Sequence, residues 1–409
     1  MAHTALRRLA AAFPCWQMAS LLLAGLALIG SACKDADSPT SPQTPPALAS
    51  AAQTMAFVQV SAGGSHTCGV TANHRAYCWG TNGSGALGDG TTDERLSPVA
   101  VVGGLSFRQV SAGVSFTCGV TTDDRAYCWG SNFQGQLGDG TTSHRQVPVA
   151  VAGARRFRQV QVGSSHACAI TMDNLAFCWG DNASGKLGDG TMTNRLIPVR
   201  VQAGARRFTR VSVGYYHTCG VAADALGYCW GANFTGQLGD GTTTDRVTPV
   251  AIRGGRSLRQ LSAGSQHTCA VTIGNAAYCW GSNRYGQIGD GTSGYASRRV
   301  RPVAVLGGRS FAAVGADGGH SCGVTTSNVA YCWGDNASGQ LGDATNTKRT
   351  TPVAVAGGQR FSGLSTGYFH NCGVTTGERA YCWGANGGGR LGNGTTTDSS
   401  TPVQVAGAL

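Results

Sequence analysis

The sequence predicts an all-β fold made of seven copies of one structural unit. The triplet Cys-Trp-Gly occurs seven times, at intervals of 50 to 53 residues. The same apolar runs and glycine clusters recur between the triplets, and 63 of the 409 residues are glycine. Repeats of about 50 residues with four short strands each are typical of β-propeller blades. We therefore expect a seven-bladed β-propeller over residues 55–409, with four short antiparallel strands in each blade.

Each unit contains four runs with the composition of a strand. In the second unit the expected strands are 107–112, 116–121, 125–130 and 148–152. The last of these begins on Pro148, which suits an edge strand because proline has no N–H to donate to the ladder. Glycine clusters separate the runs, as turns with positive φ require. The repeats begin on a first strand and end on a fourth, so we expect the ring to close with little strand exchange.

Residues 1–33 have the composition of an export signal. Two arginines precede an apolar stretch, 18–30, which is too short for an expected membrane span. The small residues before Cys33 resemble a bacterial lipobox, although Gly30 stands where that pattern usually has leucine. We therefore expect Cys33 to be lipidated. The alternative is cleavage nearby, with Cys33 removed or left as a free thiol.

The next segment, residues 34–54, is rich in proline, serine and alanine and reads as a flexible tether. We expect an exported protein of a bacterial cell envelope, held by its lipid on the outer membrane or cell surface, or else secreted. The formal net charge is +11. The basic residues do not form stripes interleaved with aromatic residues, so we expect no nucleic-acid partner.

Fourteen of the 16 cysteines lie in the repeats, as pairs ten residues apart. Each expected turn lies midway between the partners, so the two cysteines face each other on adjacent strands. Facing residues have Cα atoms about 4.5–5.5 Å apart, and disulfides accept about 4.4–6.8 Å. An exported protein is in an oxidising compartment, and the C-x-x-C knuckles of zinc sites are absent. We predict one cross-strand disulfide per blade, in the pairs Cys68–Cys78, Cys118–Cys128, Cys168–Cys178, Cys219–Cys229, Cys269–Cys279, Cys322–Cys332 and Cys372–Cys382.

Three short motifs carry a resemblance to a known family. They are Gly-x-x-His at 63–66, Trp-Gly-x-Asn at 79–82 and Gly-x-Leu-Gly at 85–88, and they recur in nearly every unit. These units resemble the repeats of the regulator of chromosome condensation family, over about 350 residues. The resemblance implies a seven-bladed propeller. Members of that family include exchange factors for a small GTPase and secreted bacterial inhibitors of β-lactamases. Exchange activity does not suit an exported protein.

Repeated histidines, aspartates and tryptophans are interpreted as structural. Equivalent positions on different blades are too far apart to share one metal ion, so we expect buried histidines bonded to backbone. The Asp-Gly pairs are turn signals and lack the ligand pattern of a calcium loop. We expect the tryptophans to pack between sheets, and we expect no metal and no cofactor. The histidines are His66, His166, His217, His267, His320 and His370, with Phe116 in the second unit.

A functional site should lie where the repeat is broken. The loops after the first and third strands share one face, and there some units carry aromatic residues or arginine where others have glycine, serine or alanine. Such residues are enriched at protein interfaces. The alternative is that they only cover the rim of the channel. The proposed binding residues are Tyr215, Tyr216, Tyr368, Phe369, Phe133, Phe234, Arg284, Tyr285 and Tyr295, the last in a segment with three extra residues.

The opposite face carries arginines between successive blades. They would suit acidic membrane headgroups, but solvated charge is the simpler interpretation. These arginines are Arg155, Arg156, Arg206, Arg207, Arg256, Arg309 and Arg360.

The sequence shows no G-x-S-x-G, H-E-x-x-H or P-loop motif. We therefore expect a monomeric, non-enzymatic binding or scaffold protein with a protein or glycan partner in the envelope or outside. One alternative is an inhibitor of the β-lactamase-inhibitor kind. A glycan-acting envelope enzyme is a further alternative, but it would need a non-repeating pair of carboxylates.

Overall fold

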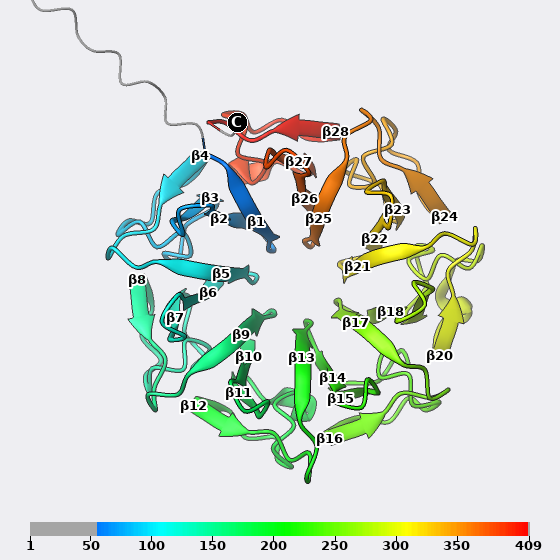
Figure 1. Ribbon diagram of the computed structural model, residues 1–409, viewed down its shortest axis with the longest axis horizontal. Coiled ribbons are helices and arrows are strands. Elements are labelled where there is room, and N and C mark those ends of the chain that lie inside the picture. Colours follow the sequence, from blue (N-terminus) through cyan, green and yellow to red (C-terminus); the bar gives the residue numbers. More distant parts are fainter. Residues whose placement is uncertain (1–54, 408–409) are drawn as a thin grey trace, which may run out of the picture. The chain divides into compact units, whose positions relative to one another are not determined.

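The structure is a computed structural model, and it describes residues 55–407. Seven four-stranded antiparallel sheets are arranged in a ring, each built from four strands that are consecutive in the chain (Figure 1). We number these sheets as blades 1 to 7 in chain order. The expected seven-bladed β-propeller is confirmed. The expected signal segment, the tether and Cys33 lie outside the described residues.

The first strand of each blade lies at the centre of the ring (Figure 1). These strands are β1 (Phe57–Ala62), β5 (Phe107–Ala112), β9 (Phe157–Val162), β13 (Phe208–Val213), β17 (Leu258–Ala263), β21 (Phe311–Asp317) and β25 (Phe361–Thr366). The second strands are β2 (His66–Thr71), β6 (Phe116–Thr121), β10 (His166–Thr171), β14 (His217–Ala222), β18 (His267–Thr272), β22 (His320–Thr325) and β26 (His370–Thr375).

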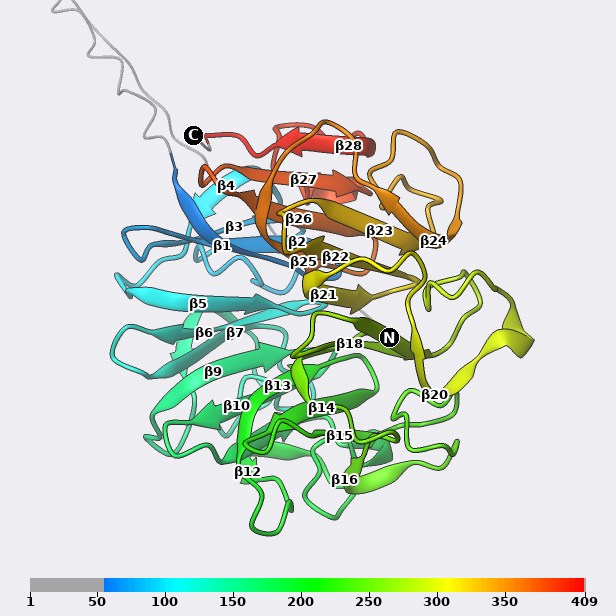
Figure 2. The same cartoon turned by 45° about the vertical axis from the view of Figure 1, so that its right-hand side comes forward.

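The third and fourth strands complete each sheet, and the fourth lies at the periphery (Figures 1 and 2). The third strands are β3 (Ala76–Gly80), β7 (Ala126–Gly130), β11 (Ala176–Gly180), β15 (Gly227–Gly231), β19 (Ala277–Gly281), β23 (Ala330–Gly334) and β27 (Ala380–Gly384). The fourth are β4 (Arg95–Ala100), β8 (Arg145–Ala150), β12 (Arg195–Arg200), β16 (Arg246–Ala251), β20 (Arg299–Ala304), β24 (Arg349–Ala354) and β28 (Ser399–Gln404). Three single turns of 3-10 helix, η1 (Ala183–Gly185), η2 (Tyr295–Ser297) and η3 (Gly387–Gly389), lie in loops. Within residues 55–407, no helix is long and apolar enough to cross a membrane.

The fourth strand differs from the expectation. In blade 2 it runs from Arg145 to Ala150, so Pro148 lies inside it instead of at its start. The register between β7 and β8 shifts between Cys128 and Gly130. Because Gly130 pairs with Arg145, the fourth strand begins at Arg145, earlier than expected. A proline is tolerated there because the outermost strand has a neighbour on one side only.

All seven predicted disulfides are present. Cys68 and Cys78, for example, are direct partners in the register of β2 and β3, with Cα atoms 4.0 Å apart. Each bridge therefore joins the two middle strands of its own blade and none crosses between blades. The disulfides stabilise single sheets, and other interactions must hold the ring together.

Hydrophobic packing between neighbouring sheets contributes to that cohesion. Seven buried clusters each combine residues of two adjacent blades. At the seam between blades 1 and 2, Val70 and Cys68 pack with Phe107 and Trp129. The repeated tryptophans are fully buried, as expected for residues that pack between sheets. Burying side chains of this size contributes about 25 cal/mol for each Å² of apolar surface.

Side-chain hydrogen bonds cross the same seams. The Nε2 of Gln59 donates to the carbonyl of Val110, whose own N–H donates back to Oε1 of Gln59. Nearer the face that carries the first-to-second strand loops, the N–H of Ala112 donates to the hydroxyl of Ser61 at 2.9 Å. These bonds satisfy backbone groups of the inner strands that have no further strand to pair with.

The ring closes without strand exchange, as expected. Blades 7 and 1 form two separate sheets. Their seam repeats the contacts of the others, because the N–H of Ala62 donates to Ser365 and the indole N–H of Trp79 donates to the carbonyl of Arg390.

Glycine is required where the inner strands converge. A Cβ added to Gly163 would lie 2.0 Å from the carbonyl oxygen of Gly214 in the next blade. A side chain at this point would force the two blades apart. The equivalent residue is glycine in six of the seven blades.

Candidate interaction face and channel

The loops after the first and third strands lie on one face, as expected from the strand order. Tyr216, between β13 and β14, contacts Phe234, which follows β15, with ring centroids 5.8 Å apart. Both side chains are exposed, Tyr216 to 41 %. We call this side of the ring the loop face.

Five of the nine proposed binding residues form one series of ring contacts on the loop face. Phe234 contacts Tyr216, Tyr216 contacts Tyr215 at 6.0 Å, Tyr215 contacts Tyr368 at 5.0 Å, and Tyr368 contacts Phe369 at 4.4 Å. We call these five residues the aromatic series. Its two ends are exposed, whereas Tyr215 and Tyr368 are half-buried.

The aromatic series crosses the mouth of the central channel. Tyr215 belongs to blade 4 and Tyr368 to blade 7, and these blades are not neighbours in the ring (Figure 1). Their rings can therefore meet only over the channel. Burial, followed by the nearby carboxylate of Asp317, raises the pKa of both phenols above the usual value. Both are neutral and able to donate a hydrogen bond at physiological pH.

Three further proposed residues form a second group. The guanidinium of Arg284 lies 5.0 Å from the centre of the Tyr285 ring and 4.6 Å from that of Tyr295. Tyr295 belongs to η2, in the segment with extra residues, and is 75 % exposed. Tyr285 packs on the turn of blade 6, where a Cβ on Gly319 would lie 2.8 Å from its ring.

Phe133 stands apart from the other proposed residues. It lies on blade 2, is 72 % exposed, and its ring contacts His144 at 4.2 Å. Among the described residues it makes no ring contact with the aromatic series.

Asp317 is a residue of this region that the sequence reasoning missed. It occupies the converging position where the other six blades have glycine. In blade 6 the first strand is one residue longer, and Asp317 pairs with His320 across the tight turn of Gly318 and Gly319. An acidic residue at a glycine position was the signal available in the sequence.

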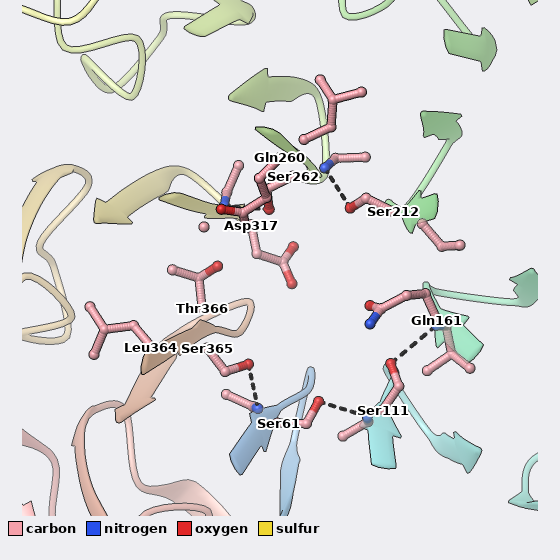
Figure 3. A pocket seen from close by; sticks show the side chains of 18 of the residues that line it. Ser61, Ser111, Gln161, Ser212, Gln260, Ser262, Asp317, Leu364, Ser365 and Thr366 are labelled. Atoms are coloured by element: carbon pink, nitrogen blue, oxygen red, sulfur yellow. Dashed lines mark hydrogen bonds between the residues drawn. The ribbon is translucent and has the colours of Figure 1, made fainter. Parts of the chain in front are cut away.

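The Asp317 side chain points into the channel (Figure 3). The channel encloses a cavity of about 350 Å³, lined by the seven first strands, with serine, glutamine and threonine among its polar side chains. The N–H of Gly318 donates to the carboxylate at 2.7 Å. Burial raises the pKa of Asp317 to about 7, against the opposing effect of that bond. No basic side chain of residues 55–407 forms an ion pair with it.

Comparison with known proteins assigns the family. A family model described as the RCC1-like domain matches residues 25–362, and one described as the regulator of chromosome condensation (RCC1) repeat matches residues 378–409. The chain belongs to the RCC1-like domain family. No curated protein sequence matches it.

Solved structures show the same fold as this RCC1-like propeller. Human WBSCR16 is 20 % identical with a TM-score of 0.74, covering 81 % of this chain and 94 % of that one. Prp20p of Saccharomyces cerevisiae is 18 % identical with a TM-score of 0.73, covering 87 % and 88 %. The CRINKLY WD40 ectodomain of the Arabidopsis thaliana receptor kinase ACR4 is 20 % identical with a TM-score of 0.53, covering 85 % and 98 %.

The repeated histidines of the RCC1-like propeller bond to side chains across the seams, which corrects the expected bond to backbone. Nε2 of His66 lies 2.8 Å from the hydroxyl of Thr117 in the next blade. That hydroxyl donates to the carbonyl of Ala86, so it accepts from the imidazole. Nδ1 is left buried without a partner, and burial lowers the pKa of His66 to about 4.

The aspartates of the Gly-Asp-Gly-Thr loops hold those loops together. Asp89 accepts hydrogen bonds from Asn82 and Thr91 and forms an ion pair with Arg95 at 2.8 Å. Burial raises the pKa of Asp89, but the bonds from Thr91 and Arg95 outweigh it, and the pKa lies below its usual value. The carboxylate is therefore engaged within its own loop.

A buried lysine was also missed. Lys186 replaces the glutamine found in most units, and forms an ion pair with Asp181. The hydroxyl of Ser165 donates to the same carboxylate at 3.0 Å. Burial raises the pKa of Asp181, but the hydrogen bond and charge of Lys186 bring it below the usual value. The charge of Lys186 is therefore balanced by Asp181, and the carboxylate also accepts a hydrogen bond from Ser165.

Most arginines of the opposite face are engaged with their own blade. Arg155 lies 4.4 Å above the centre of the Phe177 ring, and Arg156 forms an ion pair with Asp123. Equivalent stacking pairs are Arg206–Tyr228, Arg256–Tyr278 and Arg309–Tyr331. Arg207 pairs with Asp173, and Arg360 donates to the carbonyl of Ser327. These contacts give the arginines a structural role.

Proposed function

We propose that this protein is a non-enzymatic exported binding protein whose loop face binds a protein partner. The observation that carries the proposal is the aromatic series across the channel mouth. Its rings come from non-adjacent blades and occupy positions where other repeats have small residues, so the fold does not require them. Aromatic side chains that are partly exposed and held by ring contacts are the residues that supply binding energy at interfaces.

The family supports this function at a general level. The yeast relative Prp20p is described by its binding properties to Gsp1p and histones, so an RCC1-like propeller serves there as a protein-binding scaffold. Seven disulfides suit an oxidising compartment outside the cytoplasm. A monomer with a lipid at Cys33 and a tether over residues 34–54 would present the propeller to partners at the envelope surface.

Partner capture with a matched control tests the proposal. The full-length mature protein is immobilised, envelope extract is passed over it, and retained proteins are identified and their affinities measured. The test variant carries Tyr216→Ser, Phe234→Ser and Phe369→Ser on the loop face. The control carries Met172→Ser and Ile273→Ser, two exposed apolar residues in the turns between second and third strands.

The test variant should lose at least about tenfold in affinity, because each truncated anchor costs 1 kcal/mol or more. The control should retain the wild-type affinity. Equal capture by all three proteins would refute the loop face as the binding surface. Membrane fractionation of a Cys33→Ser variant tests the anchor separately, and this variant should move from the membrane to the soluble fraction.

A further inference from the structure

The end of the central channel at the loop face carries a carboxylate at a position where the repeat has glycine. The seven first strands converge there (Figure 1), and in six blades the converging residue is glycine. Blade 6 instead places a carboxylate, Asp317, at this point. A pocket of about 30 Å³ at this end is lined by Tyr215 and Asp317 together with glycine, alanine and valine residues of other blades.

Within residues 55–407 the carboxylate of Asp317 forms no ion pair, although Arg210 of β13 lines the same cavity. Among the described residues its hydrogen bond comes from the N–H of Gly318, and the nearby Ser262 hydroxyl accepts from the N–H of Ala316 (Figure 3). A half-buried carboxylate without a cationic partner costs free energy that a bound cation would recover. The other six blades have glycine at this position, so the repeat itself does not require a carboxylate there.

The surroundings of Asp317 suit an organic cation. The rings of Tyr215 and Tyr368 meet 5.0 Å apart over the channel, and the carboxylate is close enough to affect the pKa of both phenols. Aromatic faces attract ammonium groups. No group of three or more histidine, cysteine, aspartate or glutamate side chains within residues 55–407 is placed to hold a metal ion.

We propose that Asp317, Tyr215 and Tyr368 form a binding site for a primary alkylammonium cation. The small pocket has room for a group the size of one or two water molecules, which matches an ammonium head. The wider cavity of about 350 Å³ has room for the rest of the molecule. The head would pair with the carboxylate and lie against the ring of Tyr215, which is in contact with the ring of Tyr368.

The site predicts a definite pH dependence. The empty carboxylate has a pKa of about 7, whereas an alkylammonium stays protonated to about pH 10. The other titratable groups near it are the phenols of Tyr215 and Tyr368, which stay neutral, and His320, which pairs with Asp317 in the sheet and whose pKa is lowered by burial. Arg210 of β13 lines the same cavity. Below pH 7 the cation competes with a proton, so its affinity should fall about tenfold per pH unit, and above pH 7 it should level off.

Calorimetric titration of the full-length protein with n-butylammonium chloride tests the site, with sodium chloride at equal ionic strength as the blank. Asp317→Gly restores the residue of the other six blades and is expected to fold normally, whereas Asp317→Asn keeps the shape and removes the charge. Both should weaken binding at least about tenfold at pH 8. Tyr368→Leu should weaken it about 2- to 30-fold through loss of the ring face, and Tyr368→Phe should not.

Two probes separate the sources of such a cation. If the peptide acetyl-Gly-Lys-Gly-amide also binds in an Asp317-dependent way, the natural ligand is a lysine side chain of a protein. If only n-butylammonium binds, it is a free amine, and both results support the site. The proposal is overturned if n-butylammonium does not bind, or if it binds wild type and Asp317→Gly equally. No protein partner is needed, so the outcome is independent of the proposed function.

Discussion

Phe116 of blade 2 and Ala167 of blade 3 lie in one hydrophobic cluster at the seam between their blades. At the other six seams of the described ring, the same two positions hold a histidine and a residue that accepts its hydrogen bond. Those pairs are His66–Thr117, His166–Thr218, His217–Thr268, His267–Ser321, His320–Asn371 and His370–Thr67. The two departures from the repeat therefore compensate each other, because both residues are apolar and belong to the same cluster.

This pairing predicts strong coupling between the two positions. Phe116→His alone should destabilise the protein by about 1–3 kcal/mol, because it buries an imidazole without an acceptor. Adding Ala167→Thr supplies the acceptor and should recover about 1 kcal/mol or more. Denaturant unfolding of the wild type, the two single variants and the double variant, all with intact disulfides, measures the coupling free energy of this double-mutant cycle. Strict additivity of the two changes would show that the seam does not depend on the pair.

The buried histidines predict acid sensitivity. Burial lowers the pKa of His217 and His267 to about 3 and that of His66 to about 4, from an ordinary value of 6.5. The unfolded chain then binds more protons than the folded one below pH 6.5, so stability is complete above that pH and is lost as the pH falls toward 3. Melting temperatures between pH 8 and pH 4 should fall accordingly. Replacing one pair, with His217→Phe and Thr268→Ala, should flatten the slope, and an unchanged slope would contradict this account.

Asp317 predicts the opposite trend. Its pKa is raised from 3.8 to about 7 by burial, so the folded state binds the extra proton. Its contribution is most favourable below pH 4 and is lost as the pH rises through 7. Asp317→Gly should therefore stabilise the protein above pH 7, by something on the order of 2 kcal/mol after allowing for partial exposure. Unfolding at pH 5 and at pH 8.5 tests this, since the gain should be larger at the higher pH.

The disulfides predict a measurable loss on removal. Each closes a loop of about 11 residues, so replacing Cys118 and Cys128 together with alanine should cost about 3 kcal/mol in the chain-entropy model. Thiol titration of denatured, unreduced wild-type protein should find none of the fourteen repeat cysteines free. Fourteen additional thiols should appear after reduction. A high free-thiol count in exported protein would contradict the bridges.

Two glycines should respond differently to alanine. Gly163→Ala places a Cβ 2.0 Å from the carbonyl of Gly214 and should destabilise the ring by several kcal/mol or prevent folding. Gly363 has no atom within 4 Å of an added Cβ and no positive φ, so Gly363→Ala should be neutral or stabilising by up to about 1 kcal/mol. Thermal unfolding compares them, and equal effects would show that convergence of the strands does not set the glycine requirement.

Features of a single blade were predictable because they depend on local signals. The spacing of Cys118 and Cys128 placed them opposite each other, and the alternation of apolar residues located 107–112 and 116–121 to the residue. The fourth strand was misplaced, since its start at Arg145 depends on a register shift between Cys128 and Gly130 in the neighbouring strand.

Contacts between residues of different blades could be identified only from the structure of the closed ring. The sequence by itself determined the repeat, the disulfide pairs and the positions where aromatic residues depart from the repeat. The tertiary structure decided that Tyr215 and Tyr368, about 150 residues apart in the sequence, lie ring to ring over the channel, while Phe133 does not join them. It also decided that Asp317 points into the channel and that Phe116 and Ala167 share one hydrophobic cluster. The reason is physical: local periodicity specifies each sheet, whereas the curvature of seven packed sheets sets which residues of distant blades meet.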